Sequence, residues 1–356
     1  MKKFTNKYKL EIISLSILSL IYFISRLSFL TSLPLFTDEA IYIFWGKFIA
    51  SNYSNWFISV TDGKPPLLIW MMFPLFHIFP DSMYLIVGRL PSVMAGWSAM
   101  IAMFMIAKLL FKTKRAGIIA SILYIATPYF LFHDRLALYD SLLSSMLLWT
   151  TYFAFRTAKT LKLRDAILWG IFLGLSFLSK ATAIIFLGLL PVGVILLTSK
   201  NDLFKNWRKI IILSVAAGII GESINSIQRL SSVYFLTVQK NAQFQIPIES
   251  LIKDPFQQTF GNLNAISGWI ISYITFPIFI LGLVCFVYLF FRKFRIALVL
   301  LMLFITPIII LSTIGQIIFP RYFLFTTPYF ILPIAFVLDR ILQNNKKYIY
   351  GIIVVF

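Results

Sequence analysis

The sequence predicts an all-α integral membrane protein with about ten to eleven transmembrane helices. Of its 356 residues, 60% are hydrophobic and only 13% are charged, whereas a soluble domain carries about 25% charged residues. Apolar runs of roughly 20 residues recur from end to end, and clusters of Lys and Arg separate them. No polar segment is long enough to fold as a soluble domain, so we expect residues 1–356 to form a single transmembrane domain.

Ten apolar runs are interpreted as spans. An eleventh would begin at Tyr348, where only nine residues remain, about half of what a helix needs to cross a bilayer. We therefore expect either a truncated C-terminus or a partial last helix. The ten expected spans lie at residues 10–31, 84–111, 116–132, 139–157, 166–179, 181–198, 210–226, 266–290, 296–314 and 322–338.

The basic residues test this arrangement, because Lys and Arg are enriched in cytoplasmic loops. Of the 32 basic residues, 21 fall in the N-terminal segment and in the five loops predicted to be cytoplasmic, the longest of which is Ser199 to Lys209. The apolar segment 65–79 is only about 15 residues long. If it were counted as a span, every later loop would be assigned to the opposite side of the membrane. We therefore interpret it as interfacial or re-entrant, which leaves the loops 34–83 and 227–265 outside.

Both outer loops have features of their own. Within 34–83, Ile41, Phe44, Trp45, Phe48 and Ile49 follow the spacing of an amphipathic helix, which should lie flat on the outer membrane surface. The loop 227–265 is rich in Gln and Asn, and we interpret it as a lid.

Several classes of site are excluded. Cys285 is the only cysteine, so intramolecular disulfides and thiolate zinc sites are impossible. His77 and His133 form no HExxH pattern, and no GxxxxGK[ST] loop is present to hold a nucleotide. The net charge of +19 is scattered between spans rather than gathered on one face, so nucleic acid is not an expected partner. The sequence requires no cofactor and leaves a divalent metal unknown.

Charged residues at the outer side are the candidate site residues, because ionisable groups near a membrane are costly and often functional. Each also has a structural interpretation. Asp38 and Glu39 open the amphipathic helix, where acids complement the helix dipole; Lys64 precedes two prolines and is an equally good interfacial anchor, as is Arg321. The turn 133–141 carries Asp134, Arg135 and Asp140, which suit either an ion pair or chemistry. For Arg89, Lys180 and Glu222, structural pairing or interfacial anchoring is the favoured interpretation.

Taken in order, these motifs resemble the membrane glycosyltransferases of the GT-C class, specifically the protein O-mannosyltransferase and aminoarabinose transferase group. The resemblance covers Phe36 to about Pro191 and resumes near residue 320. It rests on Asp38-Glu39, Lys64-Pro65-Pro66-Leu67, Gly88-Arg89-Leu90-Pro91-Ser92, the Asp134-Arg135 to Asp140 turn, Gly174 to Lys180, and Pro320-Arg321-Tyr322. The chain departs from the family in having fewer spans, and in Lys180-Ala181-Thr182 where relatives have Lys-Gly-Pro.

The resemblance implies a polyprenyl-phosphate sugar donor and an acceptor hydroxyl or phosphate on a protein, glycolipid or lipid-linked glycan, with membrane lipids around the enzyme. It implies an inverting transfer at the extracytoplasmic face of the cell membrane. Asp38 would be the catalytic base, with Glu39 as its catalytic neighbour, and Lys64 and Arg321 would bind the donor phosphate. Arg89, Asp134, Arg135 and Asp140 would support the site.

Two interpretations from other classes remain. A transporter or flippase of lipid-linked sugars would also bury charges along a pathway, although the sequence contains no internal repeat. A non-catalytic binder of lipid-linked sugars would need Lys64 and Arg321 but would tolerate the loss of Asp38.

Overall fold

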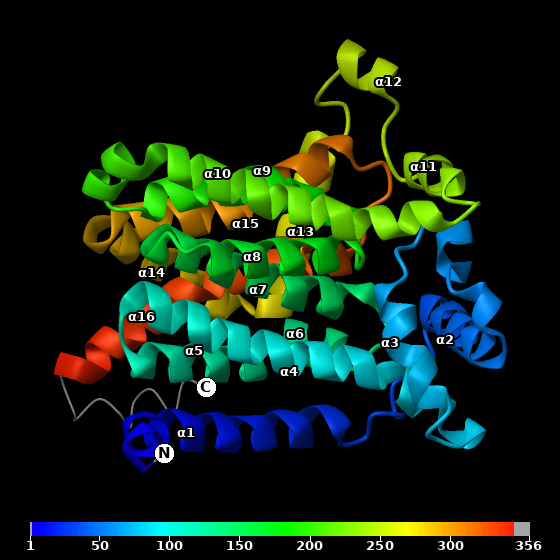
Figure 1. Ribbon diagram of the computed structural model, residues 1–356, viewed down its shortest axis with the longest axis horizontal. Coiled ribbons are helices and arrows are strands. Elements are labelled where there is room, and N and C mark those ends of the chain that lie inside the picture. The colour runs from blue at the N-terminus through cyan, green and yellow to red at the C-terminus, as the bar shows by residue number, and fades with distance from the viewer. Residues whose placement is uncertain (1, 345–356) are drawn as a thin grey trace.

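Helices form in every region where the sequence predicts a span, in a computed structural model that describes residues 2–344 (Figure 1). The span expected from Tyr348 lies outside the described residues. Most long helices run side by side along the long axis of the molecule, and α7 packs against both α4 and α8, while α8 packs against α10. These helices are α1 (Lys2–Leu27), α4 (Tyr84–Phe111), α5 (Lys114–Ala126), α7 (Tyr139–Thr160), α8 (Leu163–Phe177), α9 (Ile184–Leu197), α10 (Lys200–Asn225), α13 (Thr259–Ile274), α14 (Phe276–Arg292), α15 (Phe294–Ile314) and α16 (Thr327–Asn344).

The prediction of an all-α membrane fold is confirmed at this level. Among the described residues, five helical segments are long and apolar enough to cross a membrane, or six if α13 and α14 form one bent span. Helices α5, α8 and α9 have only 13, 15 and 14 residues, fewer than the roughly 20 that a straight crossing requires. The number of ten to eleven spans therefore stays a prediction.

Three predicted boundaries were wrong. The expected span 266–290 is broken at Thr275, where α13 and α14 meet at an angle of 104°. Pro277 explains the break, because proline has no N–H to continue the hydrogen bonds of a preceding helix. The span 116–132 likewise ends at Ala126, and a short helix α6 (Pro128–His133) restarts at a proline. The loop Ser199 to Lys209 is largely helical, since α10 begins at Lys200 with Ser199 as its N-cap.

The segment 34–83 folds at one end of the bundle, which we call the cavity end. It contains α2 (Thr37–Ser51), α3 (Leu67–Phe76) and the 3₁₀ helices η1 (Tyr53–Asn55), η2 (Ile58–Asp62) and η3 (Asp81–Met83). A second apolar core joins α2 and α3 to residues 136–142, which lead into α7. The close contact of α2 with α4 depends on Gly88, since a Cβ there would lie 2.4 Å from a side-chain carbon of Ile43. This packing holds the segment 34–83 against the start of α7.

The amphipathic face predicted for α2 was partly wrong. Trp45 and Ile49 are buried, whereas Ile41, Phe44 and Phe48 are exposed. Helix α2 is therefore apolar on two faces, one packed on α3 and the other directed away from the protein.

The segment 227–265 contains η5 (Ser226–Leu230), α11 (Phe235–Ala242), α12 (Ile248–Lys253) and the start of α13. Helix α11 packs on η2, and Lys240 forms an ion pair with Asp62 at 3.7 Å. The 3₁₀ helix η6 (Pro320–Thr326) enters the same end of the bundle from α15 and leads into α16.

Candidate active site

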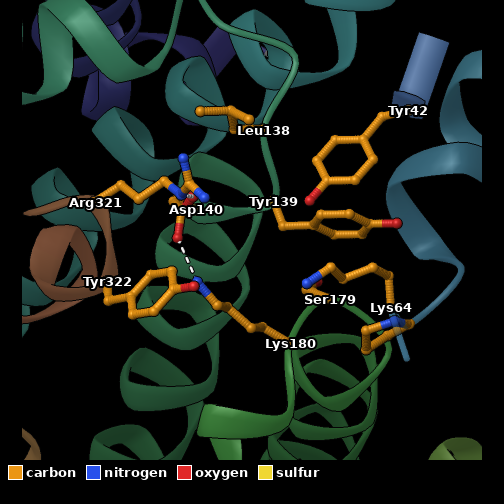
Figure 2. Close-up of a pocket in the computed structure, with 10 residues that line it drawn as sticks. Tyr42, Lys64, Leu138, Tyr139, Asp140, Ser179, Lys180, Arg321 and Tyr322 are labelled. Atoms are coloured by element: carbon orange, nitrogen blue, oxygen red, sulfur yellow. Dashed lines mark hydrogen bonds and ion pairs between the residues drawn. The ribbon is translucent and has the colours of Figure 1, made fainter. Parts of the chain in front are cut away.

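A polar cavity of about 40 Å³ opens at the cavity end, and segments far apart in the sequence meet around it (Figure 2). Its charged side chains come from the segment before α3, from the first turn of α7, from the turn after α8 and from η6. They are joined by three tyrosines. The lining residues are Tyr42, Lys64, Pro65, Leu138, Tyr139, Asp140, Ser179, Lys180, Arg321 and Tyr322.

Asp140 lies at the centre of the charge network. One of its carboxylate oxygens accepts a hydrogen bond from Lys180 Nζ at 2.7 Å, and the other lies 3.7 Å from Arg321 Nε. The same Lys180 ammonium lies 3.8 Å from the centre of the Tyr322 ring. Burial lowers the pKa of Lys180 below its ordinary value, although Asp140 opposes this. Lys180 is thus a partly desolvated cation with one carboxylate partner.

Arg321 connects this network to Asp38. Its Nη2 donates a hydrogen bond of 2.7 Å to Asp38 Oδ2, across 283 positions of the chain. The guanidinium also lies within 5.2 Å of the ring centres of Phe36 and Phe319. An arginine fork can meet two acceptors at once, and here it contacts Asp38 and Asp140 together.

The backbone before and after Lys64 in the sequence fixes the position of this residue. Gly63 has a φ of 71°, a conformation that glycine adopts without strain, and a Cβ there would lie 2.7 Å from the side chain of Lys240. After the two prolines, Leu67 N donates to Leu178 O at 3.0 Å, which ties this segment to the turn that carries Lys180. The ammonium of Lys64 lies 5.1 Å from the centre of the Phe244 ring.

A second, larger cavity of about 290 Å³ adjoins the polar one, and it is mainly apolar. The two cavities share four lining residues: Lys64, Pro65, Lys180 and Tyr322. The other lining residues come from the start of α9, from the end of α15 and from the segment after α11, where Asn241, Phe244 and Gln245 lie. A charged cavity therefore lies directly beside an apolar one.

Glu39 and Arg89 form a fully buried pair that does not line either cavity. Arg89 donates to Glu39 at 2.8 and 2.9 Å, and its remaining hydrogen bonds go to the carbonyls of Leu30, Leu33 and Pro34. Glu39 also accepts from the backbone N–H groups of Phe36 and Ala137. Glu39, predicted as the catalytic neighbour of Asp38, therefore has both carboxylate oxygens bonded inside the protein, and the pair joins three segments that surround the site.

Asp134 and Arg135 also lie away from the cavity. Asp134 is fully buried, accepts hydrogen bonds from Tyr22, Tyr124 and Ser141, and lies 3.6 Å from Arg26 Nε. Arg135 donates to the carbonyls of Ser28 and Phe29. Their contacts fasten the turn before α7 to the end of α1, so any support of Asp140 acts through the backbone.

Sequence reasoning assigned Lys180 only a structural interpretation, and it assigned the three tyrosines no role. One signal pointed to Lys180: it ends a predicted span on the outer side, where the positive-inside rule makes lysine uncommon. The tyrosines Tyr42, Tyr139 and Tyr322 gave no such signal, because aromatic residues are common throughout this chain. The structure brings Lys64, Arg321 and Asp140 together at the cavity, with Asp38 bonded to Arg321.

The charges of the site favour an anion. Three cations, Lys64, Lys180 and Arg321, face two carboxylates, Asp38 and Asp140. The excess positive charge suits a phosphate group, which Arg binds as a fork and Lys as a point charge. Within residues 2–344, no group of three or more His, Cys, Asp or Glu side chains has the arrangement of a metal site.

Comparison with protein families supports the class expected from the motifs. The family model described as dolichyl-phosphate-mannose-protein mannosyltransferase matches residues 63–223. Those residues include Lys64, Asp140 and Lys180, whereas Asp38 and Arg321 lie outside the match. No curated protein sequence matches the chain.

Solved structures share the fold at low sequence identity. ArnT from Cupriavidus metallidurans, bound to undecaprenyl phosphate, has a TM-score of 0.65 and 15% identity over 94% of this chain and 60% of its own. The archaeal oligosaccharyltransferase AglB from Archaeoglobus fulgidus, in complex with an inhibitory peptide and a dolichol-phosphate, has a TM-score of 0.59 and 15% identity over 98% of this chain and 52% of its own. The chain thus spans about 60% of the length of ArnT. The chain thus matches this mannosyltransferase family over residues 63–223 and shares its fold with ArnT and AglB.

Proposed function

We propose that this GT-C class chain transfers a sugar from a polyprenyl-phosphate donor to an acceptor at its cavity end. The observation that carries the proposal is the adjacency of the two cavities: a cationic cavity shares four lining residues with an apolar one of about 290 Å³. A lipid-phosphate sugar has the same division, with a long apolar chain, one phosphate and a polar sugar. The carriers named in the ArnT and AglB structures, undecaprenyl phosphate and a dolichol-phosphate, support this choice of donor.

In the proposed complex, the first isoprene units of the carrier occupy the apolar cavity and the rest of the chain remains in the bilayer. Lys64 and Lys180 lie at the border of the two cavities, which is where the phosphate must sit. Arg321 approaches the same position from η6. These three cations would stabilise the negative charge that develops on the phosphate as it leaves, and no cofactor is part of the mechanism.

Asp38 is the proposed base. The acceptor oxygen would form a bond to the anomeric carbon while its proton passes to an Asp38 carboxylate oxygen. The bond from that carbon to the phosphate oxygen would break, and polyprenyl phosphate would leave with the electron pair. A single displacement of this kind inverts the anomeric configuration, and one carboxylate is sufficient for it. An acceptor phosphate would be ionised already and would depend less on the base.

The ion pair between Arg321 and Asp38 fits this sequence of events. Without a donor, Arg321 contacts both Asp38 and Asp140. A phosphate that enters beside Lys64 and Lys180 would compete for the guanidinium and release Asp38 to meet the acceptor. The base would then become available only after the donor is bound.

The remaining details of the proposal concern the acceptor and its location. The excess of Lys and Arg in the opposite loops favours an extracytoplasmic cavity end in a multi-pass cell-membrane protein. A protein, a glycolipid or a lipid-linked glycan would reach the polar cavity from that side. With the proposed ten to eleven spans, the cavity and both predicted outer loops, 34–83 and 227–265, would lie on the extracytoplasmic side.

The experiment that tests the proposal is transfer by the purified protein. We expect transfer from a polyprenyl-phosphate sugar, and none from a nucleotide sugar when no lipid carrier is present. Glycans and lipid-linked sugars from cells with and without the gene, compared by mass spectrometry, would identify the sugar and the acceptor. Transfer from a nucleotide sugar in detergent would overturn the choice of donor.

The same preparation separates the two other classes. A transporter or flippase would move the lipid-linked sugar between leaflets of proteoliposomes without forming a new glycosidic bond. A non-catalytic binder would retain the donor, and substitution of Asp38 would leave its binding unchanged. Formation of a glycosylated product that requires Asp38 is expected only for the transferase.

A further inference from the structure

The segment between α11 and α13 forms a projection that is fastened at both of its ends. Before the projection, Ile246 N donates to Ile314 O at 2.8 Å, and Gln316 N donates to Phe244 O at 3.0 Å. After it, the side-chain amide of Asn262 donates to the carbonyls of Ser312 and Gly315, both at 2.9 Å. Both anchors are made to the last turn of α15 and the residues that follow it. Residues 247–261, which we call the finger, are therefore held at the level where α15 ends.

Four large apolar side chains are exposed on the finger, beside exposed polar ones that include Asp254, Gln257 and Gln258. Ile248, Ile252, Phe256 and Phe260 are 75%, 76%, 60% and 74% exposed, and they follow one another at intervals of four residues. The Phe256 and Phe260 rings lie 6.2 Å apart. No residue of α12 is buried. A segment surrounded by water would leave this apolar surface unprotected, at a large cost in free energy.

The other side of α12 is polar. Glu249 and Lys253 are exposed and follow Ile248 and Ile252 by one position each. Successive residues of a helix differ in direction by about 100°, so the two pairs occupy different faces. A short helix with one apolar and one polar face fits the boundary between lipid and water.

The direction in which the finger projects indicates whether lipid or water surrounds it. Figure 1 shows α12 standing off the side of the bundle, across the direction of the long helices, and not beyond their ends. The finger leads into the bent pair α13 and α14 and is fastened to the end of α15, and both the pair and α15 are candidate spans. A projection that leaves a membrane bundle sideways at the end of its spans enters the headgroup region of the adjacent leaflet.

We propose that the finger inserts into the lipid leaflet at the cavity end through Ile248, Ile252, Phe256 and Phe260. The residues just before it, Phe244 and Gln245, line the apolar cavity. Insertion would keep this wall of the cavity in contact with the lipid phase. This role differs from that of the water-exposed polar lid expected from the sequence, and it does not depend on the proposed transferase activity.

Depth-dependent quenching tests the proposal. A single cysteine replaces Ile252 in a Cys285→Ala background and carries an environment-sensitive fluorophore. A matched variant carries it at Glu249, on the polar face of the same helix, and both are placed in phosphatidylcholine vesicles with or without bromine on the acyl chains. We expect a blue-shifted emission and a marked loss of it in brominated lipid for the Ile252 probe, and a smaller loss for the Glu249 probe.

Two outcomes would overturn the proposal. An aqueous spectrum at Ile252 with no quenching would show that the finger lies in water as a lid. A blue-shifted but unquenched spectrum, together with disulfide formation between Ile252→Cys chains, would show that a second copy covers the finger. A probe at Phe256 repeats the measurement at the other end of the surface, so that a local distortion at one site does not decide the result.

Discussion

At the scale of single residues, the site is a set of competing ion pairs. Asp140 contacts Lys180 and Arg321, and Arg321 also contacts Asp38. Charged groups that are removed from water are stable only with partners, so these pairs hold the walls of the cavity together. The same contacts can be exchanged for a phosphate, because the cations exceed the carboxylates by one.

Asp38→Asn keeps the shape of the side chain and removes the base. We expect turnover to fall by at least about 100-fold, the lower end for general acid-base catalysis, while the carrier phosphate still binds. Radiolabelled transfer and carrier binding are measured on the same preparation. Glu249→Gln is the control, since this exposed acid lies on the finger. Wild-type turnover by Asp38→Asn would remove Asp38 from the mechanism.

Arg321→Lys keeps the charge and removes the fork that meets two acceptors. A hydrogen bond to a charged group contributes about 1.5–3 kcal/mol, so the loss of one such contact should weaken carrier-phosphate binding roughly 10-fold or more. Lys64→Ala should have an effect of similar size. Isothermal titration with the lipid phosphate measures both. Unchanged binding and turnover in both variants would make these residues interfacial anchors only.

Binding of the carrier phosphate should also depend on pH through Lys180. Phosphate favours the protonated ammonium, and burial lowers the pKa of this lysine in the empty site. Affinity is therefore expected to fall as pH rises through a value below the ordinary lysine pKa of about 10.4. Lys180→Arg should bind without this decline, because arginine stays protonated. Identical pH profiles for the two proteins would count against a role for Lys180 in binding phosphate.

At the scale of the elements, the site is assembled by the packing of α2, α3 and the start of α7. The buried pair Glu39 and Arg89 joins the first turn of α2 to α4, and the bond from Ala137 N to Glu39 extends the connection to the turn before α7. Asp38 is adjacent to Glu39 in the sequence, and Asp140 follows Ala137 by three positions. The distance between the two carboxylates thus depends on a pair that touches neither cavity.

Glu39→Gln should lower the stability of the protein, whereas Asp38→Asn should lower its turnover. Removal of one partner from a buried pair costs about 3–5 kcal/mol, because the charge of Arg89 would be left without a counter-ion. We expect a clear decrease in the unfolding temperature of Glu39→Gln in detergent, and little change for the partly exposed Asp38. Thermal unfolding followed by tryptophan fluorescence compares the two variants directly. Equal unfolding temperatures would contradict the structural role.

At the scale of the whole molecule, the cavity end and the opposite end differ in charge. The predicted cytoplasmic loops hold most of the basic residues, whereas the cavity end holds the carboxylates that meet Lys180 and Arg321. This polarity is the basis for the proposed orientation, because positive loops are retained in the cytoplasm.

Cysteine labelling tests the orientation. Ser54 lies at the cavity end and Lys162 lies in the turn between α7 and α8, and both are exposed. In a Cys285→Ala background, an impermeant maleimide added to intact cells should label a cysteine at position 54 and not one at position 162. Permeabilised cells serve as the control, in which both positions should react. Labelling of position 162 alone in intact cells would place the cavity in the cytoplasm.

The sequence by itself determined the all-helical membrane fold, the approximate position of each helix, and Asp38, Lys64, Asp140 and Arg321 as charges at one end. These properties depend on local windows of hydropathy and on the distribution of basic residues. Helix breaks at Thr127 and Thr275 were missed, although each lies one or two residues before a proline. The proline after each break was a local signal, but the signal of the long apolar run around it was stronger.

Only the tertiary structure decided which charges meet. Lys180 and Asp140 are 40 positions apart, and Arg321 and Asp38 are 283 apart, so no local pattern could pair them. The structure also separated adjacent residues: Glu39 faces the interior with Arg89, while Asp38 faces Arg321. Consecutive residues of a helix point about 100° apart, and only the packing of α2 against α3 and α4 determines which of the two directions leads to the cavity.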